Sequence, residues 1–166
     1  DYNNVSIMSE AENCIQNCID SFGGIDILIN SAGIANNRLL FQMSQKDFDT
    51  VIDNNLKGMF APTKFAAILF RQQRSGRVVN LTSDAGLGEI GKSNNAAASE
   101  GIIGLTRTTA TDLGKYGVTA NAISPIAKTR LHDGTVESYL SSELITSNSD
   151  DKAGIGISDP SLEWQV

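Results

Sequence analysis

The sequence has few basic residues, only two cysteines and one histidine, His132, and each shortage excludes a class of protein. Its 13 Lys and Arg residues are outnumbered by 19 Asp and Glu residues and form no basic stripe, so we do not expect a nucleic-acid-binding protein. The histidine and cysteines are too few for a zinc site. Apolar runs are far shorter than a membrane span, and the polar residues 1–4 predict no signal peptide, so we expect a cytoplasmic protein.

The two cysteines, Cys14 and Cys18, are predicted to be core thiols on a helix. Ser9 with Glu12 predicts a capping box at the helix start, apolar residues follow at helical spacing, and Gly23 ends the helix. Residues four apart on a helix are poorly placed for a disulfide, so we expect neither a disulfide nor a metal pair here.

Short apolar runs alternate with helical periodicity in the rest of the sequence. The runs predict buried strands at residues 25–29, 77–81 and 118–123. The periodic segments predict a short helix that begins at Ser44 and Asp47, and long helices over about 55–71 and 96–113. This alternation of strands and helices predicts a doubly wound, Rossmann-like α/β fold with a parallel sheet.

By composition the chain divides into two regions. Residues 1–131 hold the strands and helices of the core, whereas residues 132–166 form a polar, substrate-loop-like region and a C-terminal tail. The segment 135–152 is rich in Ser, Asp and Glu, which predicts a weakly ordered loop.

Five local patterns follow one another in a fixed order. They are ILINSAG at residues 27–33, VIDNNLKG at 51–58, GRVVNLTS at 76–83, GIIGLTR at 101–107 and GVTANAISP at 117–125. Together they resemble the short-chain dehydrogenase/reductase family over roughly residues 5–131. The resemblance implies an NAD(P)-dependent oxidoreductase fold.

The resemblance also assigns the family's catalytic positions. In that family a serine and a tyrosine hold the substrate oxygen, a lysine four residues after the tyrosine lowers its pKa, and an asparagine holds a water of the proton relay. Here Ser83 stands at the serine position and Asn55 at the relay position. Asn95 stands at the tyrosine position and Ser99 at the lysine position. An amide is no proton donor of suitable pKa and Ser99 carries no charge, so no intact catalytic set is expected.

The family's nucleotide-binding unit is a strand, a glycine-rich turn and a helix, and it precedes the first matching residues. We therefore expect the sheet to lack its first β-α-β unit and this chain to bind no cofactor. The resemblance implies vestigial cofactor positions at Asn30, Gly33 and Thr129. Each candidate residue also has a structural explanation: Asn30 ties strand ends together, and Asn55 satisfies backbone groups at a helix bend.

These observations favour a non-catalytic subunit that assembles with and stabilises an active NAD-dependent hydroxyacyl-CoA-type dehydrogenase, an arrangement similar to that of the benzylsuccinate pathway. Assembly, as a hetero-oligomer or a homo-oligomer, would use the helices at 55–71 and 96–113. A stripe on the second helix is the expected contact and comprises Ala98, Ile102, Leu105, Thr109 and Leu113. Two alternatives remain open: an active NAD(P)-dependent alcohol or hydroxyacyl oxidoreductase with a different acid, and an acyl-CoA-binding module.

Overall fold

The computed structural model describes residues 2–125 and contains a three-stranded parallel sheet in the order β1-β2-β3. The strands are β1 (Ile27–Asn30), β2 (Gly76–Leu81) and β3 (Val118–Ile123). The α/β prediction is confirmed. The predicted boundary near residue 131, the tail beyond it, Thr129 and His132 lie outside the described residues. Within residues 2–125, no helix combines the length and the apolar character needed to cross a membrane.

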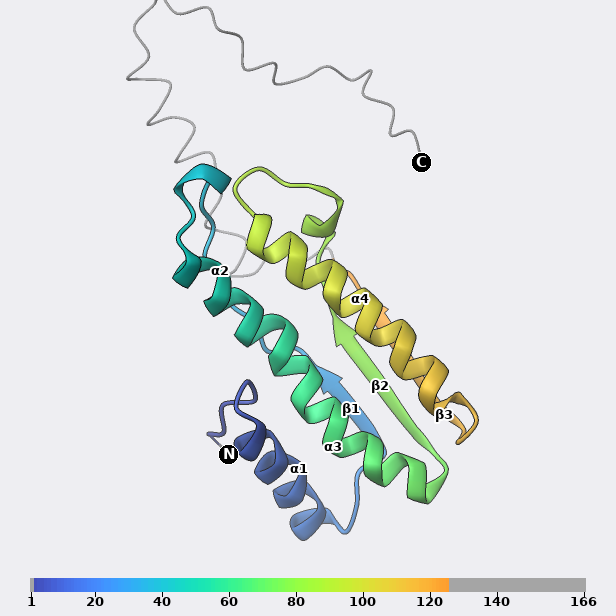
Figure 1. Ribbon diagram of the computed structural model, residues 1–166. Coiled ribbons are helices and arrows are strands. Elements are labelled where there is room, and N and C mark those ends of the chain that lie inside the picture. The colour runs from blue at the N-terminus through green and yellow to red at the C-terminus, as the bar shows by residue number, and fades with distance from the viewer. Residues whose placement is uncertain (1, 126–166) are drawn as a thin grey trace, which may run out of the picture. The chain divides into compact units, whose positions relative to one another are not determined.

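Helices cover one face of this sheet (Figure 1). The α-helices are α1 (Met8–Phe22), α2 (Gln45–Val51), α3 (Gly58–Gln73) and α4 (Ser93–Gly114). Short 3-10 turns, η1 (Leu40–Gln42) and η3 (Asp84–Leu87), and a π-helical segment, η2 (Ile52–Lys57), join them. Helix α1 packs against α3, α3 packs against β1 and β2, and α4 packs against β3.

The predicted capping box at the start of α1 is wrong. The helix begins at Met8, and its cap position makes no side-chain hydrogen bond. A turn at Asn4 sets this start instead, because the Asn4 carbonyl accepts from the backbone N–H of Ile7 at 2.9 Å and the Asn4 N–H donates to Oε2 of Glu10 at 2.6 Å. Ser9 therefore lies inside the helix.

The predicted end of α1 agrees with the structure, and the prediction of core thiols holds for Cys18. Gly23 adopts φ 80°, a left-handed conformation that favours glycine, and its N–H donates to the Ile19 carbonyl at 2.7 Å. Cys14 and Cys18 are free and half-buried. Cys18 packs against the core, and its thiol is 3.8 Å from the Gly24 carbonyl oxygen.

Helix α2 begins as predicted, but the first long helix does not. The Ser44 hydroxyl accepts from the Asp47 N–H at 3.2 Å, and Asp47 Oδ2 accepts from the Ser44 N–H at 3.1 Å, which completes a capping box. The π-helical segment η2 then continues α2 directly into α3, which starts at Gly58 rather than at residue 55. A π turn adds one residue to the helical turn, and in a segment this short the apolar residues are too few for periodicity to reveal that shift.

Helix α4 starts three residues before the predicted position and includes Gly114. The chain reverses at Gly117 instead, where φ is 77° and a Cβ atom would lie 2.8 Å from the Arg74 carbonyl oxygen. The stripe predicted as an oligomer contact is wrong, because it faces the core of the chain. Of its five members only Leu105 is not buried, and the buried ones are Ala98, Ile102, Thr109 and Leu113.

The core lies between the sheet and the helices. Its buried members come from α1, α3, α4 and the strands, and are Ile15, Ile25, Ala66, Phe70, Val78, Leu113 and Val118. Gly76 at the start of β2 makes this packing possible, because a Cβ atom there would overlap the Phe70 ring. The face of β1 away from the helices is exposed, with Ile27 at 58% and Ile29 at 62%, so the prediction of a buried strand holds for one face only.

A buried polar network joins the sheet to α3 and α4. The Asn30 amide donates to Asn80 Oδ1 at 2.8 Å and to Thr63 Oγ1 at 2.9 Å. The Asn80 amide donates to Thr106 Oγ1 at 2.8 Å, and Thr106 donates to the Ile102 carbonyl at 2.7 Å. Asn30 thus ties neighbouring strands together, as predicted.

Candidate functional site

The candidate residues gather beyond the carboxyl ends of β1 and β2, where ligands bind in open α/β sheets. Segment 31–39 follows β1, Ser83 follows β2, and α4 begins beside both. The backbone N–H of Arg38 donates to the Gly91 carbonyl at 2.8 Å, which holds the two loops together.

Asn55 lies in the π-helical segment and binds the loop after β1. Its Oδ1 accepts from the Ile34 N–H at 2.8 Å, and its Nδ2 donates to the Ile34 carbonyl at 3.0 Å. Asn55 therefore satisfies backbone groups, as predicted, but they belong to this loop and not to its own helix. Gly33 lies beside it, since a Cβ atom there would be 3.4 Å from Asn55 Oδ1.

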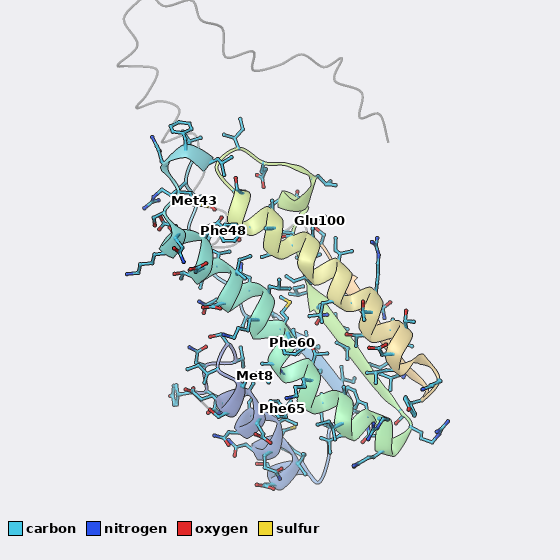
Figure 2. All side chains as sticks on the ribbon, viewed as in Figure 1. Met8, Met43, Phe48, Phe60, Phe65 and Glu100 are labelled. Carbon is cyan, nitrogen blue, oxygen red and sulfur yellow. The ribbon has the colours of Figure 1, made fainter. Side chains whose placement is uncertain are left out.

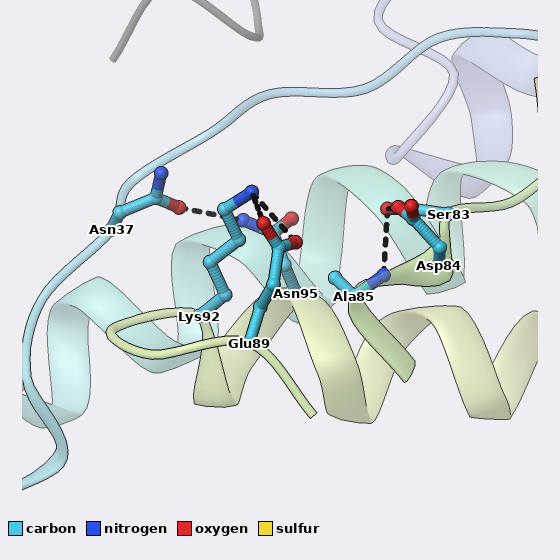
Figure 3. Close-up of polar contacts among 7 residues, drawn as sticks. All are labelled: Asn37, Ser83, Asp84, Ala85, Glu89, Lys92 and Asn95. Carbon is cyan, nitrogen blue, oxygen red and sulfur yellow. Dashed lines mark hydrogen bonds and ion pairs between the residues drawn. The ribbon is translucent and has the colours of Figure 1, made fainter. Parts of the chain in front are cut away.

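Asn95 extends this arrangement from the first turn of α4. Its Oδ1 accepts from Asn55 Nδ2 at 3.1 Å. Its Nδ2 donates to Asn37 Oδ1 at 3.0 Å, the bond that Figure 3 shows. Asn37, Asn95 and Asn55 thus form a row of hydrogen-bonded side chains, here called the amide chain. None of its three members has a side chain that ionises in the working range of proteins.

Ser83 is engaged locally. Its hydroxyl accepts from the Ala85 N–H at 3.1 Å, caps η3, and is 3.3 Å from Asp84 Oδ1 (Figure 3). Among the hydrogen bonds of residues 2–125, none joins Ser83 to Asn55 or Asn95. The structure therefore brings the two asparagines together but does not link the serine to them.

Lys92 immediately precedes α4, and Ser99 lies on α4 four residues after Asn95. Ser99 is buried, and its carbonyl accepts from Thr82 Oγ1 at 3.0 Å. Lys92 precedes the first turn, and its ammonium forms an ion pair with Glu89 at 2.6 and 2.7 Å (Figure 3). The nearby cation is thus held by a carboxylate of its own loop.

Sequence reasoning missed Asn37, Asn36 and Asn94. Asn94 is fully buried, and its amide donates to the carbonyls of Asn36 at 2.7 Å and Asp47 at 3.1 Å, while its Oδ1 accepts from the Asn95 N–H at 2.8 Å. These bonds fix the start of α4 against segment 36–47. The available signal was the pair of Asn-Asn dipeptides at 36–37 and 94–95.

Asp47, in the first turn of α2, has a shifted pKa. Hydrogen bonds from Ser44 and from Asn36 hold the pKa of Asp47 below its ordinary value. The described residues contain no group of three or more His, Cys, Asp and Glu side chains that could hold a metal ion.

The chain is similar to known dehydrogenases and reductases. A family model described as short chain dehydrogenase matches residues 3–138. The chain is 44% identical over 123 residues to a 3-oxoacyl-[acyl-carrier-protein] reductase of Synechocystis, which covers 74% of this chain and 50% of that protein. It is 45% identical over 118 residues to a hydroxyacyl-CoA dehydrogenase of Mycobacterium tuberculosis, which covers 66% of this chain and 37% of that protein.

A crystal structure of a short chain dehydrogenase from Mycobacterium avium gives a TM-score of 0.75 at 42% identity, over 79% of this chain and 47% of that chain. The chain spans about half the length of the relatives it matches. By matched family, sequence and fold, the chain belongs to the short-chain dehydrogenase family of oxidoreductases.

Proposed function

We propose that this chain is a non-catalytic member of its family that assembles with and stabilises an active NAD-dependent dehydrogenase of the hydroxyacyl-CoA type. The observation that carries the proposal is the amide chain. At the position that the family resemblance assigns to the proton-donating tyrosine, Asn95 uses its oxygen for Asn55 and its nitrogen for Asn37.

An amide at this position cannot replace a phenol. A general acid must lose its proton to the reacting oxygen and regain it, whereas a carboxamide neither gains nor loses a proton near neutral pH. Removing a general acid costs roughly 10² to 10⁴ in rate. Ser99, at the lysine position, offers no positive charge, and Lys92 is paired with Glu89.

The same residues give little support for nicotinamide binding by this chain. Asn30, a vestigial cofactor position, is buried and uses its amide for Thr63 and Asn80. Ser99 lacks the ammonium group with which relatives grip the nicotinamide ribose. Since the described residues fit the nucleotide poorly, we place NAD in the partner. Two relatives named for acyl thioesters support a partner of the hydroxyacyl-CoA type.

The exposed side of α3 supports assembly. Phe60, labelled in Figure 2, is 44% exposed. Ile68 is 46% exposed, and the exposed Lys64 lies between the two at helical spacing. Large apolar side chains exposed in a row on a helix are typical of a contact with another helix. The exposed residues of α4 are small or polar, and include Gly104 and Thr108.

Native mass spectrometry of the protein from its own source tests the proposal. We expect a complex that holds a second, longer dehydrogenase chain. Phe60→Asp should dissociate it, whereas the control variant Gln16→Asp on α1, which is also exposed to solvent, should not.

A parallel NAD(H) titration of the purified chain separates the alternatives. Saturable binding with turnover of a 3-hydroxyacyl-CoA at an ordinary enzymatic rate would refute the proposal and favour an active oxidoreductase with a different acid. A copurifying acyl thioester without any dehydrogenase would favour an acyl-CoA-binding module instead.

A further inference from the structure

The backbone on both sides of Asn37 is held by bonds that do not involve the Asn37 side chain. On one side, Asn94 Nδ2 donates to the Asn36 carbonyl at 2.7 Å. On the other, the backbone N–H of Arg38 donates to the Gly91 carbonyl at 2.8 Å, and Arg38 Nη1 donates to the carbonyl of Asn37 itself at 2.8 Å. The loop therefore presents the Asn37 side chain from a backbone that is already in place.

The amide of Asn95 is also oriented without help from Asn37. Its Oδ1 accepts from Asn55 Nδ2 at 3.1 Å, and its backbone N–H donates to Asn94 Oδ1 at 2.8 Å. Because the oxygen of this carboxamide faces Asn55, the nitrogen faces the opposite way, toward the loop after β1. Asn95 Nδ2 is thus a preorganised hydrogen-bond donor.

Asn37 supplies a carbonyl oxygen to that donor. Its Oδ1 accepts from Asn95 Nδ2 at 3.0 Å (Figure 3). The carbonyl oxygen of a small ligand would accept from the same N–H group at a similar distance. Asn37 and Asn95 are both half-buried, whereas the neighbouring Asn94 is fully buried. Asn94 therefore has the purely structural role, and the bond between Asn37 and Asn95 lies where a small molecule could reach it.

An external carbonyl competes poorly with this internal one. A free ligand loses translational and rotational freedom when it binds, whereas a side chain on an anchored backbone has already lost most of that freedom. A ligand that offers Asn95 only one hydrogen bond is therefore excluded as long as Asn37 is present.

We propose that Asn37 is an internal ligand of Asn95, an autoinhibitory contact that keeps a carbonyl-binding position of this chain filled. Removing the Asn37 side chain opens the position to small carbonyl compounds, carboxamides first, because the deleted group is itself a carboxamide. The inference needs no partner subunit and goes beyond the proposed function. In the proposed complex, the contact would leave the carbonyl group of the substrate to the active subunit.

Chemical complementation of the full chain tests this contact. Asn37→Gly deletes the side chain, and acetamide is that side chain with one added hydrogen atom. In a nuclear magnetic resonance titration, we expect acetamide to shift the Asn95 side-chain amide signal of Asn37→Gly saturably, with a Kd on the order of 100 mM for a ligand this small. The wild-type chain and Asn121→Gly, which removes an exposed asparagine on β3, should show no saturable shift.

Hydrogen exchange at the Arg38 amide separates a filled site from a structural clamp. Since the Gly91 carbonyl holds that amide, its exchange rate in Asn37→Gly should change by less than about threefold. Asn37→Ala with formamide repeats both measurements with the Cβ atom retained, and the same results are expected.

Three results would overturn the inference. A tenfold or greater rise in the exchange rate in both variants would make Asn37 a clamp of the loop. Unchanged exchange without a saturable shift would mean that water alone replaces the side chain. A saturable shift of equal size in the wild-type chain would mean that Asn37 does not keep the position filled. The proposed function stands under all three, because native mass spectrometry tests it separately.

Discussion

Truncating Asn80 tests the buried network that holds the site elements together. Its side chain is fully buried, accepts from Asn30 at 2.8 Å and donates to Thr106 at 2.8 Å. Asn80→Ala removes two hydrogen bonds, each worth about 1 kcal/mol net, and leaves a small cavity worth about 1 kcal/mol more. We therefore expect the free energy of unfolding to fall by about 3 kcal/mol, because Asn30 and Thr106 retain only their other bonds.

Urea unfolding followed by circular dichroism measures this change. Asn121→Ala is the matched control, since Asn121 lies on β3 next to Val79 but is exposed, and such surface changes stay within about 0.5 kcal/mol. The reasoning fails if both variants lose the same stability, because the network would then contribute no more than an exposed amide.

Three further predictions concern caps, charge and packing. Ser44→Ala should lower the free energy of unfolding in urea by about 1 kcal/mol, whereas Ser9→Ala should lower it by less than about 0.5 kcal/mol. Equal losses would mean that Ser9 caps α1 after all. Because the folded-state pKa of Asp47 lies below 3.8, its contribution to stability should be complete above about pH 3.8 and lost as the pH falls through the folded value. Asp47→Asn should flatten that part of the stability profile, and an unchanged slope would contradict this. Gly76→Ala should destabilise by about 3 kcal/mol in thermal unfolding because its Cβ overlaps an aromatic ring, whereas Gly104→Ala, in open space on a helix, should stabilise by about 0.5 kcal/mol.

The sequence was sufficient for the strands and insufficient for some helix boundaries. Apolar runs end at Asn30 and Ser124 because polar or breaking residues follow, so their positions could be read directly. The start of α1 depends on a turn at Asn4, several residues upstream of Ser9. The local pattern at Ser9 therefore predicted the wrong first residue of the helix. Periodicity on α4 correctly grouped Ala98 with Ile102, but a shared face does not reveal whether it meets the core or another chain.

The site could be predicted only in part, for a similar reason. The family resemblance supplied Asn55 and Asn95, and the structure joins them by a hydrogen bond. Their partner Asn37 lies 58 residues from Asn95 in the sequence. Only the packing of the β1 loop against α4 brings the two together, and no local pattern encodes that contact.

The amide chain has a direction, and the main chain sets it. Ile34 presents one donor and one acceptor to Asn55, which leaves that carboxamide a single acceptable orientation. Asn55 Nδ2 then donates to Asn95 Oδ1, and Asn95 Nδ2 must in turn donate to Asn37 Oδ1. Reversing the middle group would set oxygen against oxygen at one end and nitrogen against nitrogen at the other. The three side chains consequently reorient together or not at all, and a ligand meets a polarity set by the backbone N–H and carbonyl of a single residue of the β1 loop, Ile34.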